Sequence, residues 1–229
     1  MSSVLEENYH SIQKQIGLSA EKVGRDPKTV KLLAVSKKMD SEKIRVIWQL
    51  GHRLFGENRV QEARVKIPEM PMGGEWHFIG GLQTNKAKDA VDCFDVIESV
   101  DRLDLAQELQ KRLETAGKKM RIMLEVNVGG EAAKHGCAPE MVEELLQKVM
   151  PLSRLEVIGL MAIPPFREDP EMARPFFSKL REIRDRLQDS QGVHLPELSM
   201  GMSHDFAVAI AEGSTLVRIG TALFGARSL

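Results

Sequence analysis

Short apolar runs alternate with longer amphipathic segments along most of this 229-residue chain, and this alternation restricts the fold more than any other feature. The runs are nearly continuous apolar stretches, which is typical of strands that are buried on both faces of a parallel sheet. The eight runs predicted as strands are 32–35, 53–56, 76–79, 96–100, 122–128, 157–163, 197–200 and 217–219.

The segments between these runs have the pattern of amphipathic helices. Their apolar residues recur at spacings of three and four, with charged residues on the other face. Gly51 and Gly117 stand where helices should end, and Pro139 stands near a helix start. The helical patterns are KIRVIWQLG at 43–51, RLDLAQELQKRLETAG at 102–117, PEMVEELLQKVM at 139–150 and RPFFSKLREIRDRL at 174–187.

A strand followed by a helix, repeated eight times in roughly 200 residues, favours a closed barrel over an open doubly wound sheet. We therefore predict an α/β protein with a single (β/α)8 TIM barrel and an additional N-terminal helix over 2–23. No linker interrupts the pattern, so the whole range 1–229 is expected to form one domain. In such barrels the loops after the carboxyl ends of the strands form the active face, and the proline-containing loop 165–175 belongs to it.

Composition excludes several classes of protein. The formal net charge is −1, so no general excess of positive charge attracts nucleic acid. The polar N-terminus does not resemble a secretory signal, and no apolar run is long enough to cross a membrane, so we expect a cytoplasmic protein. Cys93 and Cys137 are far apart, and the histidines show no metal-binding spacing, so neither a disulfide framework nor a metal site is expected.

The first predicted strand ends in Ser36, Lys37 and Lys38. Because side chains alternate between the two faces of a strand, only one of the two lysines can point into the barrel. Its valine and alanine neighbours would lower its pKa by desolvation, which favours the free amine that forms a Schiff base. The alternative is that both lysines are solvated at the surface.

The segments SMGMSHD and RIGTALFG, which end predicted strands seven and eight, combine glycines with hydroxyl side chains. Such a cluster suits a phosphate group, although ordinary turn glycines are the alternative. Neither GxxxxGK[ST] nor GxGxxG is present, so the common nucleotide fingerprints are missing. Arg218 would serve either as an ion-pair anchor or as a ligand contact. The candidate phosphate residues are Ser199, Gly201, Ser203, Gly220 and Thr221.

Two histidines are weaker candidates for a functional role. His77 lies inside an apolar strand and is expected to be a hydrogen-bonded core residue rather than a metal ligand. His204 follows Ser203 directly, and adjacent residues rarely form a catalytic dyad. The GxSxG elbow of serine hydrolases is also missing.

These features together resemble the pyridoxal 5'-phosphate (PLP) barrels of the alanine racemase type. The chain is most similar to the YggS/PROSC group, the pyridoxal phosphate homeostasis proteins. The matching segments are LLAVSK at 32–37, FGENRVQEA at 55–63, EWHFIGGLQTNK at 75–86, IESVDR at 97–102, KHG at 134–136, GLMAIPP at 159–165, LSMGMSHDF at 198–206 and RIGTALFGAR at 218–227.

The resemblance implies a role for each candidate residue. Lys37 would form the internal aldimine with PLP, and Lys38 would point outward. Asn58 would lie beside the cofactor, and Arg218 would face the pyridine nitrogen. Because a guanidinium has no acceptor and stays protonated, it would leave the ring nitrogen unprotonated and make the cofactor a weak electron sink. The remaining residues would hold the phosphate: Ser203, Gly220 and Thr221, with Ser199 and Gly201 completing the loop.

The chain departs from the family pattern at two positions. The family often has proline three residues after the lysine and tyrosine after GEN, whereas this chain has Asp40 and Arg59. These departures bear on the shape of the local loops and on affinity for the cofactor.

Alanine racemase-like enzymes use a tyrosine from a second domain as the opposite acid or base. The printed sequence ends right after the eighth predicted strand, and its single tyrosine, Tyr9, falls in the predicted N-terminal helix. We therefore expect a non-catalytic protein, a monomer or weak dimer, that stores, buffers or delivers PLP, with PLP-dependent apo-enzymes as possible recipients. One alternative is a racemase or related enzyme whose second base is unrecognised, such as His204 or Cys137; another is a cofactor-free barrel that binds a protein partner.

Overall fold

Eight parallel strands form a closed barrel in which each strand pairs with the next along the chain and β8 pairs with β1. The computed structural model describes residues 2–131 and 134–225, so the ends of the predicted domain 1–229 and of the RIGTALFGAR segment lie outside the described residues. The predicted fold class is confirmed. The strands are β1 (Lys31–Val35), β2 (Leu54–Glu57), β3 (Glu75–Phe78), β4 (Val96–Val100), β5 (Met120–Glu125), β6 (Leu155–Met161), β7 (Glu197–Met202) and β8 (Leu216–Ile219).

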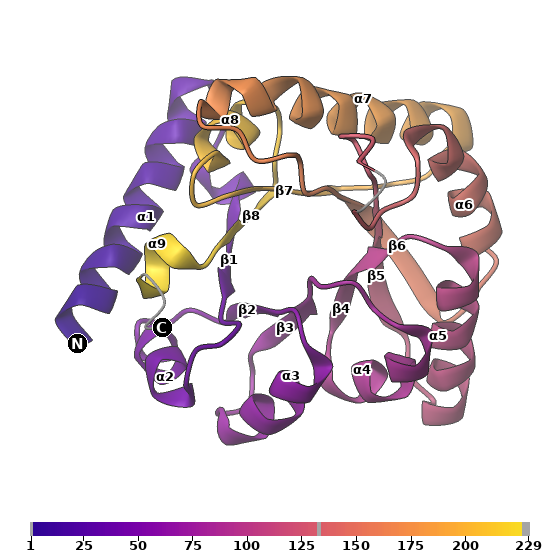
Figure 1. The fold of residues 1–229 in the computed structure, drawn as a ribbon, viewed down its shortest axis with the longest axis horizontal. Helices are drawn as coiled ribbons and strands as arrows, with labels where there is room; N and C mark the ends of the chain where they lie inside the picture. The colour runs from indigo at the N-terminus through magenta and orange to yellow at the C-terminus, as the bar shows by residue number, and fades with distance from the viewer. Residues whose placement is uncertain (1, 132–133, 226–229) are drawn as a thin grey trace.

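The helices form a ring around these strands (Figure 1). The α-helices are α1 (Ser2–Lys22), α2 (Ser41–Gln49), α3 (Val60–Lys66), α4 (Ala87–Cys93), α5 (Leu103–Ala116), α6 (Val142–Val149), α7 (Arg174–Gln191), α8 (Phe206–Ala211) and α9 (Thr221–Phe224). Short 3-10 turns are η1 (Pro27–Thr29), η2 (Ile67–Glu69), η3 (Thr84–Lys86), η4 (Pro139–Met141) and η5 (Pro170–Ala173). No helix of the described segments is both long enough and apolar enough to span a bilayer.

The strands carry two different sets of buried side chains, one on each face of the barrel wall. The outward set, which includes Phe55 and Ile97, packs against the helices and forms the main core. The inward apolar set is small and consists of Leu33, Met123, Met161 and Leu216. Since Arg218 is in register with Leu33, it also points into the barrel. Polar groups therefore occupy much of the interior.

Strands β5 and β6 each begin and end about two residues earlier than the apolar runs predict. At the amino ends, Arg121 and Glu156 belong to the strands although their charge excludes them from an apolar run. At the carboxyl ends, Val126 forms a bridge with Cys137 instead of extending the ladder. Beyond β6, Pro164 has no N–H with which to continue the sheet.

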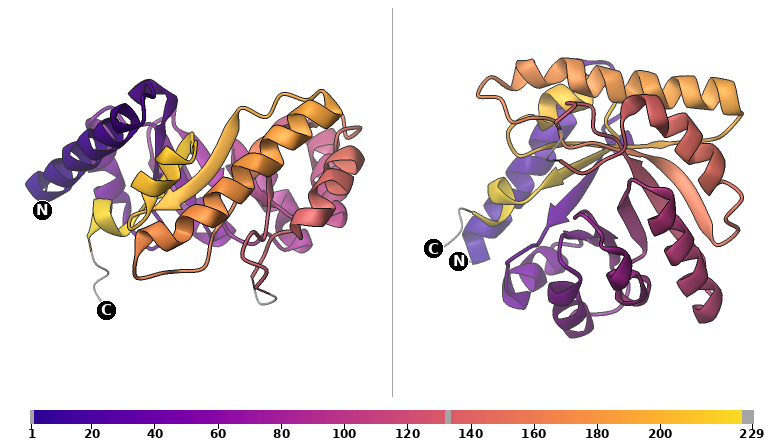
Figure 2. Two further views of the ribbon diagram at one scale, coloured as in Figure 1. Left: turned by 90° about the horizontal axis from the view of Figure 1, so that it is seen from above. Right: turned by 45° about the vertical axis from the view of Figure 1, so that its right-hand side comes forward.

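The predicted N-terminal helix is confirmed as α1, which packs against α8, α9 and α2 on the outside of the barrel. The side-chain amide of Asn8 donates to the carbonyl of Leu223 at 3.1 Å and so ties α1 to α9. Both views of Figure 2 show these two elements close together, although they lie at opposite ends of the sequence. Helix α1 therefore supports the segment that follows β8.

Candidate functional site

Lys37 lies in a turn that directly follows β1, and both of its neighbours in the chain are held by hydrogen bonds. Ser36 donates its N–H to the Gly56 carbonyl at 3.0 Å and its hydroxyl to Glu57 Oε1 at 2.7 Å. Lys38 has a left-handed backbone conformation with φ of 62°, and its N–H donates to Glu62 Oε2 at 2.9 Å. Lys37 is half-buried, whereas Lys38 is exposed.

Lys66 on α3 strengthens this turn from outside the barrel. Its Nζ donates to the Ser36 carbonyl at 2.9 Å, to Glu57 Oε1 at 3.0 Å and to Glu62 Oε2 at 3.3 Å. Burial raises the pKa of Glu57, and the nearby Lys66 and Ser36 oppose this increase. Glu57 Oε2 is buried and has no hydrogen-bond partner among the described residues. The backbone on both sides of Lys37 is therefore anchored by a cluster of charged side chains, Glu57, Glu62 and Lys66, of which Glu57 is fully buried.

Asn58 follows β2 at the same end of the barrel and is half-buried. Its backbone carbonyl lies so close to Gly80 that a Cβ added there would be 2.4 Å from the Asn58 oxygen. A side chain at position 80 would push the two strand ends apart. Glycine at this position therefore allows Asn58 to sit close to the end of β3.

The two departures from the family pattern have different structural settings. Asp40 caps helix α2, because its carboxylate accepts the N–H of Lys43 at 2.8 Å. Arg59 is exposed and lies 4.0 Å from Glu62 across a single turn. Asp40 therefore stabilises the start of α2 as its N-cap residue. The ion pair of Arg59 with Glu62 is long and exposed and contributes little to stability.

Ser203, Gly220 and Thr221 are brought together where β7 and β8 end. The Ser203 hydroxyl accepts the N–H of Ala222, in the first turn of α9, at 3.3 Å. A Cβ added at Gly220 would lie 3.2 Å from the Val35 carbonyl, so this loop lies against the end of β1, two residues before Lys37. The Ser203 hydroxyl and the Ala222 N–H therefore meet close to the strand that leads into the Lys37 turn.

Ser199 and Gly201 lie within β7 rather than in the loop that follows it, and their role in phosphate binding stays a prediction. The Ser199 hydroxyl is fully buried and bonds to Glu98 and Arg218 inside the barrel. Gly201 has φ of 92°, and a Cβ added there would lie 2.5 Å from the Ala209 Cβ on α8. Ser199 thus connects Glu98 with Arg218, and Gly201 allows α8 to pack closely against β7.

Arg218 is a buried guanidinium at the centre of the barrel. Its Nη1 donates to the Ser199 carbonyl at 2.6 Å and to the Ser199 hydroxyl at 2.7 Å, and its Nη2 donates to the Ala162 carbonyl at 2.8 Å. Burial lowers its pKa, and the nearby carboxylates Glu98, Glu125 and Asp205 oppose the decrease. The sequence left open an ion-pair anchor or a ligand contact, and the fixed geometry is compatible with both.

A chain of alternating charges leads from Arg218 across the barrel interior. Ser199 donates its hydroxyl to Glu98 Oε2, Glu98 Oε1 lies 2.6 Å from His77 Nδ1, and His77 Nε2 lies 2.8 Å from Glu75 Oε1. Glu75 in turn pairs with Arg121 at 3.2 Å. We refer to these residues, from Arg218 to Arg121, as the interior network. The sequence predicted His77 as a core histidine but missed Glu98, although a carboxylate inside the apolar run VIESV is an unusual signal.

His77 should make the stability of the fold depend on pH. Burial alone would lower its pKa, but the hydrogen bonds with Glu75 and Glu98 dominate and raise it from 6.5 to about 9. The folded protein then holds a proton that the unfolded chain releases near pH 6.5, so this stabilisation is complete below pH 6.5 and is lost as the pH rises through 9. We expect His77 to account for a decrease of about 3 kcal/mol in the free energy of unfolding across this range.

Denaturant unfolding at several pH values checks this expectation. The His77→Gln variant should be less stable at pH 6 and should lose most of the decrease between neutral and alkaline pH. Equal pH slopes in the two proteins would contradict a protonated His77 in the folded state.

The single tyrosine, Tyr9, and the two side chains considered as alternative bases, His204 and Cys137, have other surroundings. Tyr9 lies on α1, where its ring is 5.6 Å from that of His52. His204 donates from Nε2 to the Glu168 carbonyl in the loop after β6 at 2.9 Å, and its ring lies 5.5 Å from that of Phe166. Burial, with a contribution from Asp101, raises the pKa of the Cys137 thiol to about 12. None of these contacts favours a role in proton transfer for the three side chains.

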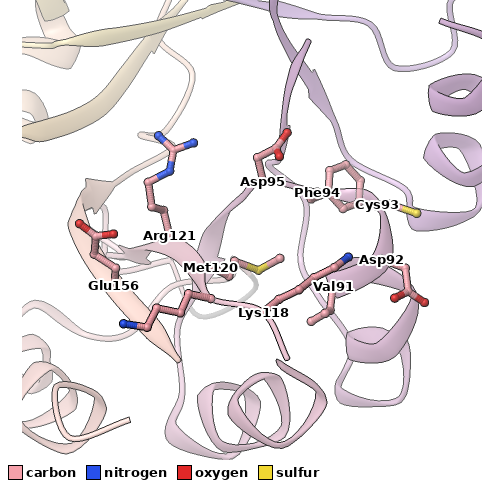
Figure 3. A pocket seen from close by; sticks show the side chains of 10 residues that line it. Val91, Asp92, Cys93, Phe94, Asp95, Lys118, Met120, Arg121 and Glu156 are labelled. Carbon is pink, nitrogen blue, oxygen red and sulfur yellow. The ribbon is translucent and has the colours of Figure 1, made fainter. Parts of the chain in front are cut away.

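A hollow of about 450 Å³ lies at the amino ends of β4, β5 and β6, the opposite end of the barrel from Lys37. Figure 3 shows Arg121 and Glu156 on one side of it, with Asp95, Phe94 and Cys93 on the other. In barrel enzymes the chemistry takes place at the carboxyl ends of the strands. The convergence of Lys37, Asn58, Arg218 and the Ser203–Thr221 loops therefore identifies the candidate site, and the hollow does not.

Comparison with known proteins shows the family to which the chain belongs. Residues 7–228 match the family described as alanine racemase, N-terminal domain. The "Pyridoxal phosphate homeostasis protein" of Aquifex aeolicus is 48% identical over 222 residues, covering 96% of this chain and 97% of that protein. The protein of the same name from Pseudomonas aeruginosa is 42% identical, covering 98% of this chain and 96% of that protein.

Solved structures show the same relationship. The structure of PipY from Synechococcus elongatus with PLP bound is 36% identical, with a TM-score of 0.81, and covers 93% of this chain and 100% of that chain. An alanine racemase from Clostridium difficile is 16% identical, with a TM-score of 0.74 over 99% of this chain and 58% of that chain, and shows the fold alone. On the identity and coverage of these relatives, the chain belongs to the pyridoxal phosphate homeostasis protein family, whose fold is the alanine racemase N-terminal domain barrel.

Proposed function

We propose that this protein binds PLP at the carboxyl ends of β1, β7 and β8 and takes part in intracellular PLP homeostasis by storing, buffering or delivering the cofactor. The observation that carries the proposal is the convergence of the anchored Lys37 turn, the buried Arg218 and the Ser203–Thr221 loops at one end of the barrel. A relative that is 36% identical over its whole length has PLP bound in its structure.

The described residues fit the groups of PLP. Lys37 offers a primary amine from a fixed backbone, and the bound cofactor supplies an aldehyde that links reversibly to such an amine. Ser203, Thr221 and the backbone at Gly220 offer hydroxyl and N–H donors that suit a phosphate. Arg218 would face the ring nitrogen and keep its own proton, and Asn58 would lie beside the ring.

A reversible link to an amine explains how one site can both hold and release PLP. Lys37 would hold the aldehyde through this link, and exchange with a free amine or an apo-enzyme lysine would release it. We propose that the protein works in the cytoplasm as one domain over 1–229, as a monomer or weak dimer, and that PLP-dependent apo-enzymes receive the cofactor.

The experiment that tests the proposal is an absorbance titration of the purified protein with PLP, followed by borohydride reduction and peptide mass mapping. We expect a visible band that saturates at one PLP per chain. Reduction should fix the label on Lys37. A label on Lys38, or one scattered over surface lysines, would contradict the proposed site.

Substitutions in the phosphate loops should weaken retention of the cofactor without abolishing the covalent link. We expect Ser203→Ala and Thr221→Ala each to increase the dissociation constant by about ten- to a hundredfold, because a hydrogen bond to a charged group contributes about 1.5–3 kcal/mol. The measurement is equilibrium dialysis of each variant against PLP. Thr115→Ala on α5 is a matched control, since its exposed hydroxyl bonds only to the Lys111 carbonyl, and a similar loss there would argue against a specific phosphate site.

A further inference from the structure

One hydroxyl, that of Ser199, connects Arg218 to the carboxylate of Glu98. Ser199 accepts from Arg218 Nη1 and donates to Glu98 Oε2, so one hydroxyl joins the two opposite charges. Glu98 and Ser199 have essentially no exposed surface. We propose that Glu98 is a positioning residue for Arg218, and that His77 fixes the orientation of Glu98 and balances its charge, so that this pair tunes the electrostatic potential at the cofactor site. The inference rests on the proposed function.

The surroundings of Arg218 and Glu98 support this assignment. Arg218 faces the carboxylates of Glu98 on β4, Glu125 on β5 and Asp205 in the loop after β7. Burial and the nearby Asp101 raise the pKa of Glu125 to about 7, so its charge is incomplete at neutral pH. Among these carboxylates, Glu98 is joined to Arg218 through the hydroxyl of Ser199.

The other carboxylate oxygen of Glu98, Oε1, also has a hydrogen-bond partner. His77 on β3 bonds to Glu98 through Nδ1 and to Glu75 through Nε2. Glu75 is half-exposed and pairs with Arg121 on β5. Arg121 also lines the hollow at the amino ends of the strands (Figure 3). The interior network therefore connects the proposed ring contact to the opposite face of the barrel.

Stability alone does not explain why charged rather than apolar side chains occupy this part of the interior. Replacing buried ion pairs with apolar residues of similar volume is often neutral or stabilising, because desolvation offsets the attraction between the charges. A fixed guanidinium at a ligand, in contrast, requires a buried counter-charge and an acceptor of defined geometry. Glu98 and Ser199 supply these two requirements at the point where Arg218 points into the barrel.

Two substitutions that remove opposite charges distinguish a tuning role from a structural one. In Glu98→Gln the positive field of Arg218 is less compensated, so Lys37 Nζ in the PLP-loaded protein should release its proton at lower pH. In His77→Gln the charge of Glu98 is uncompensated, so release should occur at higher pH. We expect the pH midpoint of the visible band to move in these opposite directions, by about half a pH unit or more for Glu98→Gln.

A matched pair of serines tests the positioning itself. Ser199→Ala removes the hydroxyl between Arg218 and Glu98, and should increase the dissociation rate of PLP several-fold. Ser214→Ala removes an equally buried hydroxyl whose partners among the described residues are the carbonyls of Leu198, Met200 and Leu216, and should leave retention and the midpoint unchanged. Far-UV circular dichroism of each variant checks that it is folded.

The outcomes separate this inference from the proposed function. If wild-type protein carries no PLP on Lys37, the proposed function fails. If the wild type is labelled but both charge variants move the midpoint in the same direction, or neither moves it, the inference alone is overturned. If Glu98→Gln does not fold, an unchanged midpoint in His77→Gln, together with equal retention in the two serine variants, overturns it as well.

Discussion

Lys37→Ala should abolish the covalent attachment of PLP and its visible band, whereas Lys38→Ala should retain both. The two residues are adjacent and chemically identical, but the turn after β1 gives them different environments. Lys37 is half-buried at the barrel mouth, while Lys38 is exposed in a left-handed conformation with its N–H bonded to Glu62. Borohydride reduction and peptide mapping of both variants, each incubated with excess PLP, measure the difference.

Non-covalent binding of PLP by the Lys37→Ala variant shows whether the rest of the site is intact. Lys37→Ala should still bind PLP weakly through the phosphate loops and Arg218, without a reducible link. Loss of attachment in both variants would indicate that the shape of the turn, rather than one amine, is required. Attachment in Lys37→Ala at the wild-type level would contradict the assignment of this lysine.

Lys66→Met should destabilise the folded protein by about 3 kcal/mol, because it leaves the fully buried carboxylate of Glu57 without its cation. Lys31→Met provides a matched control, because Lys31 pairs with Glu197 but remains half-exposed. We expect the control to change stability by less than about 1 kcal/mol. Denaturant unfolding of both variants at neutral pH gives the comparison.

The effect of Lys66→Met should depend on pH in a defined direction. Burial raises the pKa of Glu57, so the folded variant holds a proton that the unfolded chain releases; its stability therefore increases as the pH falls. Adding Glu57→Gln should recover most of the loss at neutral pH, because a buried neutral amide costs less than an unpaired carboxylate. A destabilisation that is unchanged by pH and by Glu57→Gln would show that the charge of Glu57 is not its cause.

The eight strands could be predicted from the sequence because each is a nearly continuous apolar run between helical patterns. Helices α2, α5, α6 and α7 were predicted for a similar reason, since each repeats its apolar spacing over two or more turns. The short helices α3, α4, α8 and α9 were expected only from the repeated strand–helix order, because one or two turns contain too little periodicity for a pattern of their own. Tertiary packing, rather than local pattern, defines them.

Some residues of the candidate site could be placed from the sequence, whereas the contacts of others could not. Lys37, Asn58, Ser203, Gly220 and Thr221 follow strand ends, and closure of a parallel barrel brings all such positions to one face. Ser199 and Gly201 precede the end of β7, and the direction of their contacts depends on how β7 meets β8 and α8. Glu57 and Lys66 come from different elements, and their contact with Ser36 required the packed arrangement.

By itself, the sequence determined the repeated strand–helix order, the family and the one face on which the functional groups gather, because these depend on local periodicity and on residues at strand ends. Only the tertiary structure decided which charges meet inside the barrel. The interior network joins residues of β3, β4, β5, β7 and β8. One of its hydrogen bonds, between Ser199 and Glu98, connects residues that are 101 positions apart in the sequence. Such contacts have no local signature, because the cost of burying each charge depends on a partner that the closed barrel alone brings within reach.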